Sequence, residues 1–143
     1  MEFHRNQRVL DAYVIDALLG RGSMSVVYAA HREDTEEIVA IKVLTQSQKY
    51  PVLRRRFERE ARLLKEVGRH PHIVELIDHG ILESGVPCIV MEYIDGETLR
   101  QMIYEDQAIP WGRVAHYAKQ LCEGLASVHR RGILHRDIKP SNV

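Results

Sequence analysis

Near its end the sequence reads HRDIKPSN, at residues 135–142. This polar stretch follows a long helical pattern that ends at Gly132. Turns commonly follow a glycine that ends a helix, so a solvated loop explains part of the pattern. A solvated loop alone rarely needs Asp137, Lys139 and Asn142 at this spacing, and the combination of an acid, a cation and an amide indicates a functional site.

Composition indicates a soluble globular chain. It has 143 residues, of which 45% are apolar and 28% charged, enough for one domain with a hydrophobic core. The 20 basic and 20 acidic residues cancel, so nothing favours a broad attraction to nucleic acid or to an anionic membrane. We therefore expect no nucleic-acid partner, and phosphate recognition, if present, must be local.

Cysteine usage and the start of the chain favour the cytoplasm. Cys88 and Cys122 are far apart, and we expect both to be buried free thiols rather than a disulfide. The first eight residues carry charge at once, and no window reaches the roughly 18 apolar residues that a membrane span needs. We expect a cytoplasmic chain without a membrane segment, and leave open an anchor elsewhere in a parent protein.

Hydrophobic alternation predicts about five strands and one helix in the first part of the chain. The strands are expected at residues 9–19, from 25 onward, and at 38–44, 73–77 and 87–93, with a helix at 51–67. These elements predict an α+β arrangement, an antiparallel sheet covered by a helix.

The second part of the chain is expected to be helical. Helices are predicted at residues 97–105 and 111–131, the longer one with an apolar stripe and a stop at Gly132. We place a lobe boundary near residues 93–96. This divides the chain into an N-terminal lead (1–11), a first lobe (12–94) and a second lobe (95–143).

Two glycines stand in the turn at residues 20–28, which read GRGSMSVVY. A plain hairpin turn explains this pattern by itself. The functional alternative is that Gly20 and Gly22, which lack Cβ atoms, let backbone N–H groups approach phosphate oxygens closely.

Two charged residues interrupt apolar patterns. Lys42 lies in an otherwise apolar strand, where it either reaches solvent from an edge strand or needs an anionic partner. Glu60 falls between Phe57 and Leu64 on the apolar stripe of helix 51–67. We infer an ion pair between Lys42 and Glu60, the alternative being a chance charge in an apolar stripe.

Together these features resemble the first part of a protein kinase domain. The matching motifs are a glycine loop between strands, VAIK at residues 39–42, a helix glutamate facing that lysine, and HRDIKPSN at residues 135–142. The resemblance implies a five-stranded antiparallel N-lobe with one C-helix, followed by the first helices of an incomplete helical C-lobe. It also implies transfer of the γ-phosphate of ATP to a protein hydroxyl, with ATP and Mg²⁺ as cofactors.

The resemblance assigns nucleotide binding to the first lobe. Lys42 would contact the α- and β-phosphates, with Glu60 as its helix partner, and Met91 would guard the back of the pocket. Ser25 replaces the third glycine of the family's loop, which restricts the backbone but still offers a hydroxyl or N–H to phosphate. The implied ATP-binding residues are Gly20, Arg21, Gly22, Ser23, Ser25, Val27, Ala40, Lys42, Met91, Glu92, Tyr93 and Ile94.

The resemblance assigns the transfer chemistry to the final loop, together with Lys42 and Glu60. Asp137 matches the catalytic base, Lys139 the lysine that steadies the transferred phosphate, and Asn142 the magnesium ligand. A lysine two residues after the aspartate resembles serine/threonine rather than tyrosine kinases, so the implied partner is a protein substrate with a Ser or Thr acceptor. The surrounding sequence resembles bacterial kinases of the eukaryotic type.

A DFG motif and an activation segment, which follow this loop in the family, are absent from the sequence. We therefore expect a truncated catalytic domain that alone does not phosphorylate a protein. The alternative is a non-catalytic kinase-like module that binds nucleotide or a partner protein. We also expect helix 111–131 to leave apolar surface bare.

Overall fold

The structure is a computed structural model that describes residues 3–22, 25–45, 51–106, 108–135 and 137–143. Ser23, predicted to bind nucleotide, and Arg136 lie outside the described residues. The chain forms two compact units. One comprises Met1–Gly68 and Val74–Ile94, and the other Arg69–Ile73 and Asp95–Val143.

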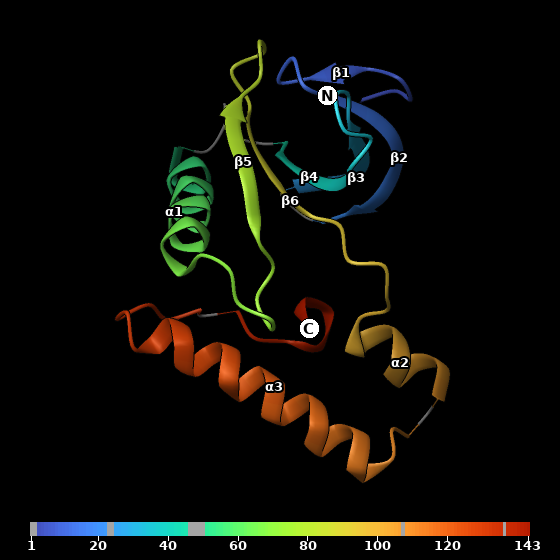
Figure 1. The fold of residues 1–143 in the computed structure, drawn as a ribbon, viewed down its shortest axis with the longest axis vertical. Helices are drawn as coiled ribbons and strands as arrows, with labels where there is room; N and C mark the ends of the chain where they lie inside the picture. The colour runs from blue at the N-terminus through green and yellow to red at the C-terminus, as the bar shows by residue number, and fades with distance from the viewer. Residues whose placement is uncertain (1–2, 23–24, 46–50, 107, 136) are drawn as a thin grey trace. The chain divides into compact units, whose positions relative to one another are not determined.

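The first unit is built on a six-stranded antiparallel sheet (Figure 1). Its strands are β1 (Arg8–Val9), β2 (Tyr13–Arg21), β3 (Ser25–Arg32), β4 (Ile38–Leu44), β5 (Leu76–Ile81) and β6 (Pro87–Glu92). Their order across the sheet is β1-β2-β3-β4-β6-β5. The predicted antiparallel sheet is confirmed, with six strands instead of five.

The additional strand arises because the strand predicted at residues 9–19 is broken by a tight turn. Leu10 and Asp11 have φ angles of 51° and 55°, in the left-handed region that residues other than glycine seldom adopt. The chain reverses there, so that Val9 pairs with Tyr13. Neither residue is a glycine, and the sequence pattern therefore gave no sign of the turn.

The strand predicted at residues 73–77 begins later, as β5. His70 and Ile73 form an isolated bridge, in which the N–H of Ile73 donates to the carbonyl of His70 at 3.2 Å. This local turn uses the backbone groups that a strand would need, so regular pairing starts only at Leu76.

The two faces of the sheet carry separate hydrophobic clusters. Ile41 of β4 is paired with Tyr28 and Val90, and all three are buried in the larger cluster. Lys42 points to the opposite face, because successive residues of a strand alternate. This alternation confirms the two faces predicted for β4.

The sheet curls until its two edge regions meet. A Cβ atom on Gly80 of β5 would lie 2.6 Å from the side chain of Leu10, in the turn after β1. The N-terminal residues also reach the larger cluster, where the ring of Phe3 lies edge-on to Tyr28 with 5.5 Å between centroids. Phe3 therefore helps to build the core of this unit.

Helix α1 (Pro51–Val67) covers the second face of the sheet, with the bounds predicted from its apolar stripe. Phe57 and Ala61 of the helix pack with Leu44 and Ile89 in the smaller buried cluster. Figure 1 shows α1 alongside β5. The helix is thereby fixed against β4 and β6, the strands that carry the predicted nucleotide-binding residues Ala40, Lys42, Met91 and Glu92.

The second unit contains α2 (Leu99–Asp106), α3 (Trp111–His129) and the short 3-10 helix η1 (Pro140–Asn142). Both predicted helices are present, and Gly132 after α3 has a φ of 72°, as expected for a glycine at a helix end. The N–H of Leu99 donates to the carbonyl of Val143 at 2.8 Å, so the start of α2 holds the residue after η1.

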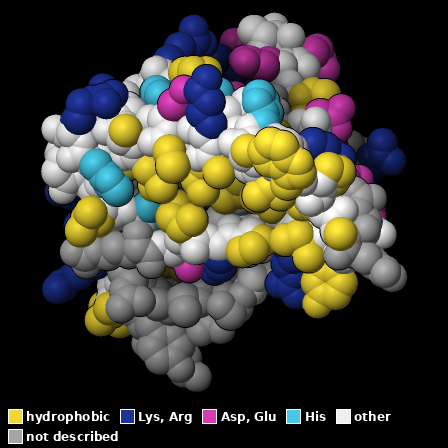
Figure 2. All heavy atoms as spheres, turned by 90° about the horizontal axis from the view of Figure 1, so that it is seen from below, with side chains coloured by type: hydrophobic (Ala, Val, Ile, Leu, Met, Phe, Trp, Pro, Cys, Tyr) yellow, Lys and Arg dark blue, Asp and Glu magenta, His cyan; other side chains and the backbone are white. Residues whose placement is uncertain are grey.

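The apolar stripe of α3 is buried only in part. Gly124, Ser127 and Val128 are buried, whereas Val114 is 48% exposed. A hollow of about 320 Å³ runs along the helix. Its lining residues are Leu99, Ile103, Ile109, Val114, Tyr117, Ala118 and Leu121. Figure 2 shows hydrophobic side chains gathered on one face, and the expectation of bare apolar surface is confirmed for this helix.

The two cysteines differ in exposure. Cys88 is buried as predicted, and burial raises the pKa of its thiol to about 11. The prediction that Cys122 is buried was wrong, since it is exposed on α3. Residues advance by about 100° along a helix, so Cys122 lies nearly opposite the buried Gly124. Within the described part of the chain, no helix is long and apolar enough to cross a membrane.

Gly124 provides a test of how α3 packs within its unit. A Cβ there would lie 3.1 Å from the carbonyl oxygen of His72, whereas a Cβ on Gly112 of the same helix meets nothing within 4 Å. We predict that Gly124→Leu lowers the free energy of unfolding by about 1–3 kcal/mol. The matched Gly112→Leu should lower it little or not at all. Equal effects in chemical denaturation would contradict this packing.

The pair between His31 and Asp16 predicts a pH-dependent stability. Nδ1 of His31 lies 2.9 Å from Oδ1 of Asp16, and this hydrogen bond raises the pKa of His31 above its ordinary 6.5. A raised histidine pKa stabilises the fold fully below 6.5, and the stabilisation is lost as pH rises through the raised value. Between pH 6 and pH 8, the free energy of unfolding measured by chemical denaturation should fall more for the unsubstituted protein than for Asp16→Asn. If both proteins lose the same free energy of unfolding between these pH values, the pair does not cause the pH dependence.

Candidate active site

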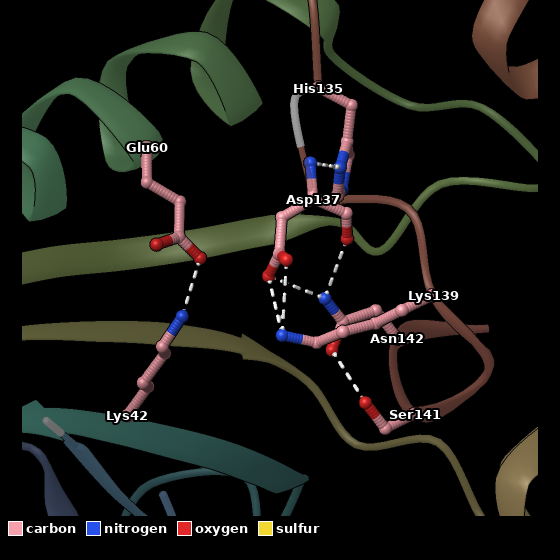
Figure 3. Close-up of polar contacts among 7 residues, drawn as sticks. All are labelled: Lys42, Glu60, His135, Asp137, Lys139, Ser141 and Asn142. Atoms are coloured by element: carbon pink, nitrogen blue, oxygen red, sulfur yellow. Dashed lines mark hydrogen bonds and ion pairs between the residues drawn. The ribbon is translucent and has the colours of Figure 1, made fainter. Parts of the chain in front are cut away.

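The predicted ion pair between Lys42 and Glu60 is present. Nζ of Lys42, on β4, lies 2.6 Å from Oε1 of Glu60, on α1 (Figure 3). The side chains are 25% and 46% exposed, so the burial that their apolar neighbours in the sequence suggested was wrong. The helix buries Phe57 and Ala61, and position 60 falls at the border of that buried face. A pair this exposed adds about 1 kcal/mol or less to stability, and its main effect is to hold the lysine in place.

Phe57 is a neighbour of this pair that the sequence did not assign to the site. Its ring centroid lies 5.9 Å from Nζ of Lys42, within the range of a cation–π contact. The sequence did contain a signal: Phe57 comes three residues before Glu60, and residues three apart on a helix lie on the same side. Lys42 is therefore held by Glu60 and by an aromatic face.

Strand register brings several predicted nucleotide-binding residues onto one face of the sheet. Val27 of β3 pairs with both Gly20 of β2 and Lys42 of β4. Ala40 of β4 pairs with Met91 of β6. Ala40 shares the face of Lys42, because the two are separated by one residue of the same strand. The register thus places these residues on one face of the sheet, and nucleotide binding by them stays a prediction.

The glycine segment forms a hairpin turn between β2 and β3. The N–H of Gly22 donates to the carbonyl of Ser25 at 2.8 Å, so this amide is used within the turn. Gly20 and Arg21 belong to the end of β2, and Ser25 begins β3. The hairpin is present, and phosphate binding by these residues stays a prediction.

Three of the predicted ATP-binding residues lie at the end of β6. Glu92 is the last residue of that strand, and Tyr93 and Ile94 come directly after it. Glu92 is tied to Glu75 by two hydrogen bonds, at 2.8 and 3.0 Å. Sequence reasoning did not single out Glu75, which has no motif signal of its own.

In the second unit, the final loop gathers its polar side chains around Asp137 (Figure 3). Nζ of Lys139 lies 2.8 and 3.1 Å from the two carboxylate oxygens of Asp137. Nδ2 of Asn142 donates to the main-chain carbonyl of Asp137 at 2.9 Å and to its carboxylate at 3.0 Å. Nδ1 of His135 accepts the N–H of Asp137 at 3.3 Å, which agrees with a scaffold role.

These contacts lower the pKa of Asp137. The hydrogen bond from Lys139 lowers the pKa of the carboxyl most, followed by the hydrogen bond from Asn142. The group is therefore ionised at neutral pH and can accept a hydrogen bond from a hydroxyl. A carboxylate oriented by a cation and an amide is suited to positioning a hydroxyl for attack.

Asn142 fits the role of a magnesium ligand. Its NH₂ group is used on Asp137, while its amide oxygen accepts a long hydrogen bond, 3.5 Å, from the hydroxyl of Ser141. An amide oxygen has a second lone pair and is a hard ligand of the type that Mg²⁺ prefers. Among the described residues, no group of three or more His, Cys, Asp or Glu side chains could hold a metal ion. Mg²⁺ commonly completes its shell with phosphate oxygens and water, so a metal here suits a nucleotide-bound ion.

A lysine–glutamate pair between a strand and a helix, and a loop that joins Asp, Lys and Asn, together define the class of protein kinases. The chain belongs to this family, since the sequence model of the protein kinase domain matches residues 13–143. The predicted family and fold class are both confirmed.

The relatives are bacterial serine/threonine kinases. Serine/threonine-protein kinase pkn2 of Myxococcus xanthus is 43% identical over 127 residues, which cover 87% of this chain and 15% of that protein. Serine/threonine-protein kinase PknB of Mycobacterium leprae is 37% identical over 137 residues, 93% of this chain and 22% of that protein. The chain thus spans less than a quarter of the length of these two relatives.

Solved structures agree with the assignment of the fold. The PknI kinase domain of Mycobacterium tuberculosis matches with a TM-score of 0.86 and 30% sequence identity. The match covers 99% of this chain and 56% of that kinase domain structure.

The contacts of Asp137 predict how its pKa responds to substitution. Lys139→Met should raise the pKa of Asp137 towards the ordinary 3.8, and Asn142→Leu should raise it less, because Lys139 has the larger effect. Carboxyl carbon NMR titration of Asp137 measures both shifts. Lys119→Met, on the exposed side of α3, is the matched control and should leave the pKa unchanged. A titration of Asp137 unaffected by Lys139→Met would show that the contact does not form in solution.

Proposed function

We propose that this chain carries the nucleotide-binding and phosphotransfer residues of an ATP-dependent protein serine/threonine kinase. Such an enzyme transfers the γ-phosphate of ATP to a Ser or Thr hydroxyl of a protein substrate. Family membership and the names of the relatives support the reaction class. The single observation that carries the proposal is the ionised Asp137 held by Lys139 and Asn142.

Asp137 accepts the proton of the substrate hydroxyl. As that oxygen attacks the γ-phosphorus, the bond to the β-phosphate oxygen breaks and ADP leaves. Lys139 lies beside the carboxylate, and its positive charge offsets charge on the transferred phosphate. The lowered pKa of Asp137 makes it an orienting acceptor more than a strong base, which suits a reaction governed by alignment.

We assign nucleotide binding to the first unit. Lys42 binds the α- and β-phosphates, while Glu60 and Phe57 limit its movement. Val27 and Ala40 lie against adenine, with Met91 behind it. The backbone of residues 92–94 hydrogen-bonds the base, and residues 20–25 cover the phosphates.

Asn142, together with the nucleotide phosphates, would hold Mg²⁺. When bound, the ion supplies positive charge that neutralises the phosphates during transfer. Because ATP is abundant in the cytoplasm, we place the activity there.

Phosphotransfer by the complete gene product tests this function. With radiolabelled ATP and a generic protein acceptor, Asp137→Asn should lower kcat by about 10²–10⁴-fold and change the KM for ATP little. Lys42→Met should lower kcat and raise the KM for ATP, because Lys42 is assigned to the phosphates of the nucleotide. Lys65→Met, an exposed lysine on α1, is the matched control and should retain activity.

Two outcomes would contradict the proposal. Turnover that survives Asp137→Asn would exclude the catalytic role of this loop. Nucleotide binding without any transfer in the unsubstituted protein would favour the non-catalytic kinase-like module.

A further inference from the structure

The hydrogen bonds between Glu75 and Glu92 depart from a regular strand pair. Glu92 donates its main-chain N–H to the carbonyl of Glu75 at 3.0 Å. In a regular hydrogen-bonded antiparallel pair, the second N–H would return to the main-chain carbonyl of Glu92. The N–H of Glu75 instead donates to the side-chain Oε1 of Glu92, at 2.8 Å.

The Glu92 carboxylate therefore takes the place of the Glu92 carbonyl in this pair. Both residues are partly buried, where an N–H group needs an acceptor. A charged acceptor forms a stronger bond than a neutral one. The main-chain carbonyl of Glu92 keeps its capacity for a donor other than Glu75.

A β-bulge beside the pair accounts for the irregularity. Leu76 pairs with Met91, and Asp78 pairs with Val90, so that Ile77 is an extra residue in β5. A bulge bends its strand and increases the local twist. Glu75 comes just before this distorted segment in the chain, and the long, flexible side chain of Glu92 reaches its N–H in place of the carbonyl.

We propose that the Glu92 carboxylate is a positioning group for adenine recognition. By binding the Glu75 N–H, it fixes the end of β6 and leaves the Glu92 carbonyl to accept a hydrogen bond from the 6-amino group of the purine. This inference rests on the proposed ATP-binding function. It assigns nucleotide selectivity to a side chain that does not itself touch the base.

Two nucleotides separate this role from a general effect on folding. ATP carries the 6-amino donor, and purine riboside 5′-triphosphate lacks it but is otherwise the same. Calorimetry with Mg²⁺ on the complete gene product should show that Glu92→Ala weakens ATP binding about tenfold. Binding of purine riboside triphosphate should change little, because it makes no use of the carbonyl.

Matched variants test the chemistry of the side chain. Glu92→Gln keeps an oxygen that can accept the Glu75 N–H, so it should retain most of the preference for ATP. Glu83→Ala, an exposed glutamate in the turn between β5 and β6, should leave both affinities unchanged. Glu92→Met keeps the bulk without an oxygen, and it replaces Glu92→Ala in the comparison if that variant does not fold.

Amide hydrogen exchange at Glu75 supplies a readout that does not depend on nucleotide. Exchange there should be faster in Glu92→Ala and remain slow in Glu92→Gln. A folded Glu92→Ala with the unsubstituted ratio of the two affinities would overturn the positioning role while leaving the proposed function intact. Failure of the unsubstituted protein to bind either nucleotide would overturn the proposed function, and this inference with it.

Discussion

The ion pair between Lys42 and Glu60 is the interaction on which the first unit's chemistry depends. It joins a central strand to helix α1, which covers that face of the sheet. Its partial exposure means that it contributes little to stability, yet it determines where a flexible ammonium group lies. The buried contacts of Phe57 and Ala61 hold the helix, and the helix in turn holds Glu60. Hydrophobic packing thus holds the helix in place, and the ion pair with Glu60 restricts the movement of Lys42.

The polar side chains of the final loop are held in place in a different way. Its polar residues are largely exposed, so packing cannot fix them, and they hold one another through hydrogen bonds centred on Asp137. The same contacts that orient the carboxylate also lower its pKa. The position of the carboxylate and its pKa are therefore set together, and loss of Lys139 would free the side chain and raise its pKa towards the ordinary value.

The sequence predicted what depends on periodicity and on motif spacing. Alternation in residues 38–44 predicted the two faces of β4, and the 3.6-residue period predicted α1 and the meeting of Lys42 with Glu60. Features that depend on backbone conformation were missed. Leu10 and Asp11 turn the chain without a glycine, and the Glu75–Glu92 pair follows from a bulge at Ile77. Periodicity also overestimated burial, because Glu60 and Cys122 share helices with buried residues but lie beyond their faces.

A double-mutant cycle on the affinity for Mg²⁺–ATP tests the central claim most directly. Lys42→Met, Glu60→Gln and the double variant are compared with the unsubstituted complete gene product by calorimetry. If Glu60 acts by placing Lys42, Glu60→Gln weakens binding when Lys42 is present and has no further effect once Lys42 is methionine. Additive losses from the two substitutions would show that Glu60 affects nucleotide binding by another route and would contradict the account.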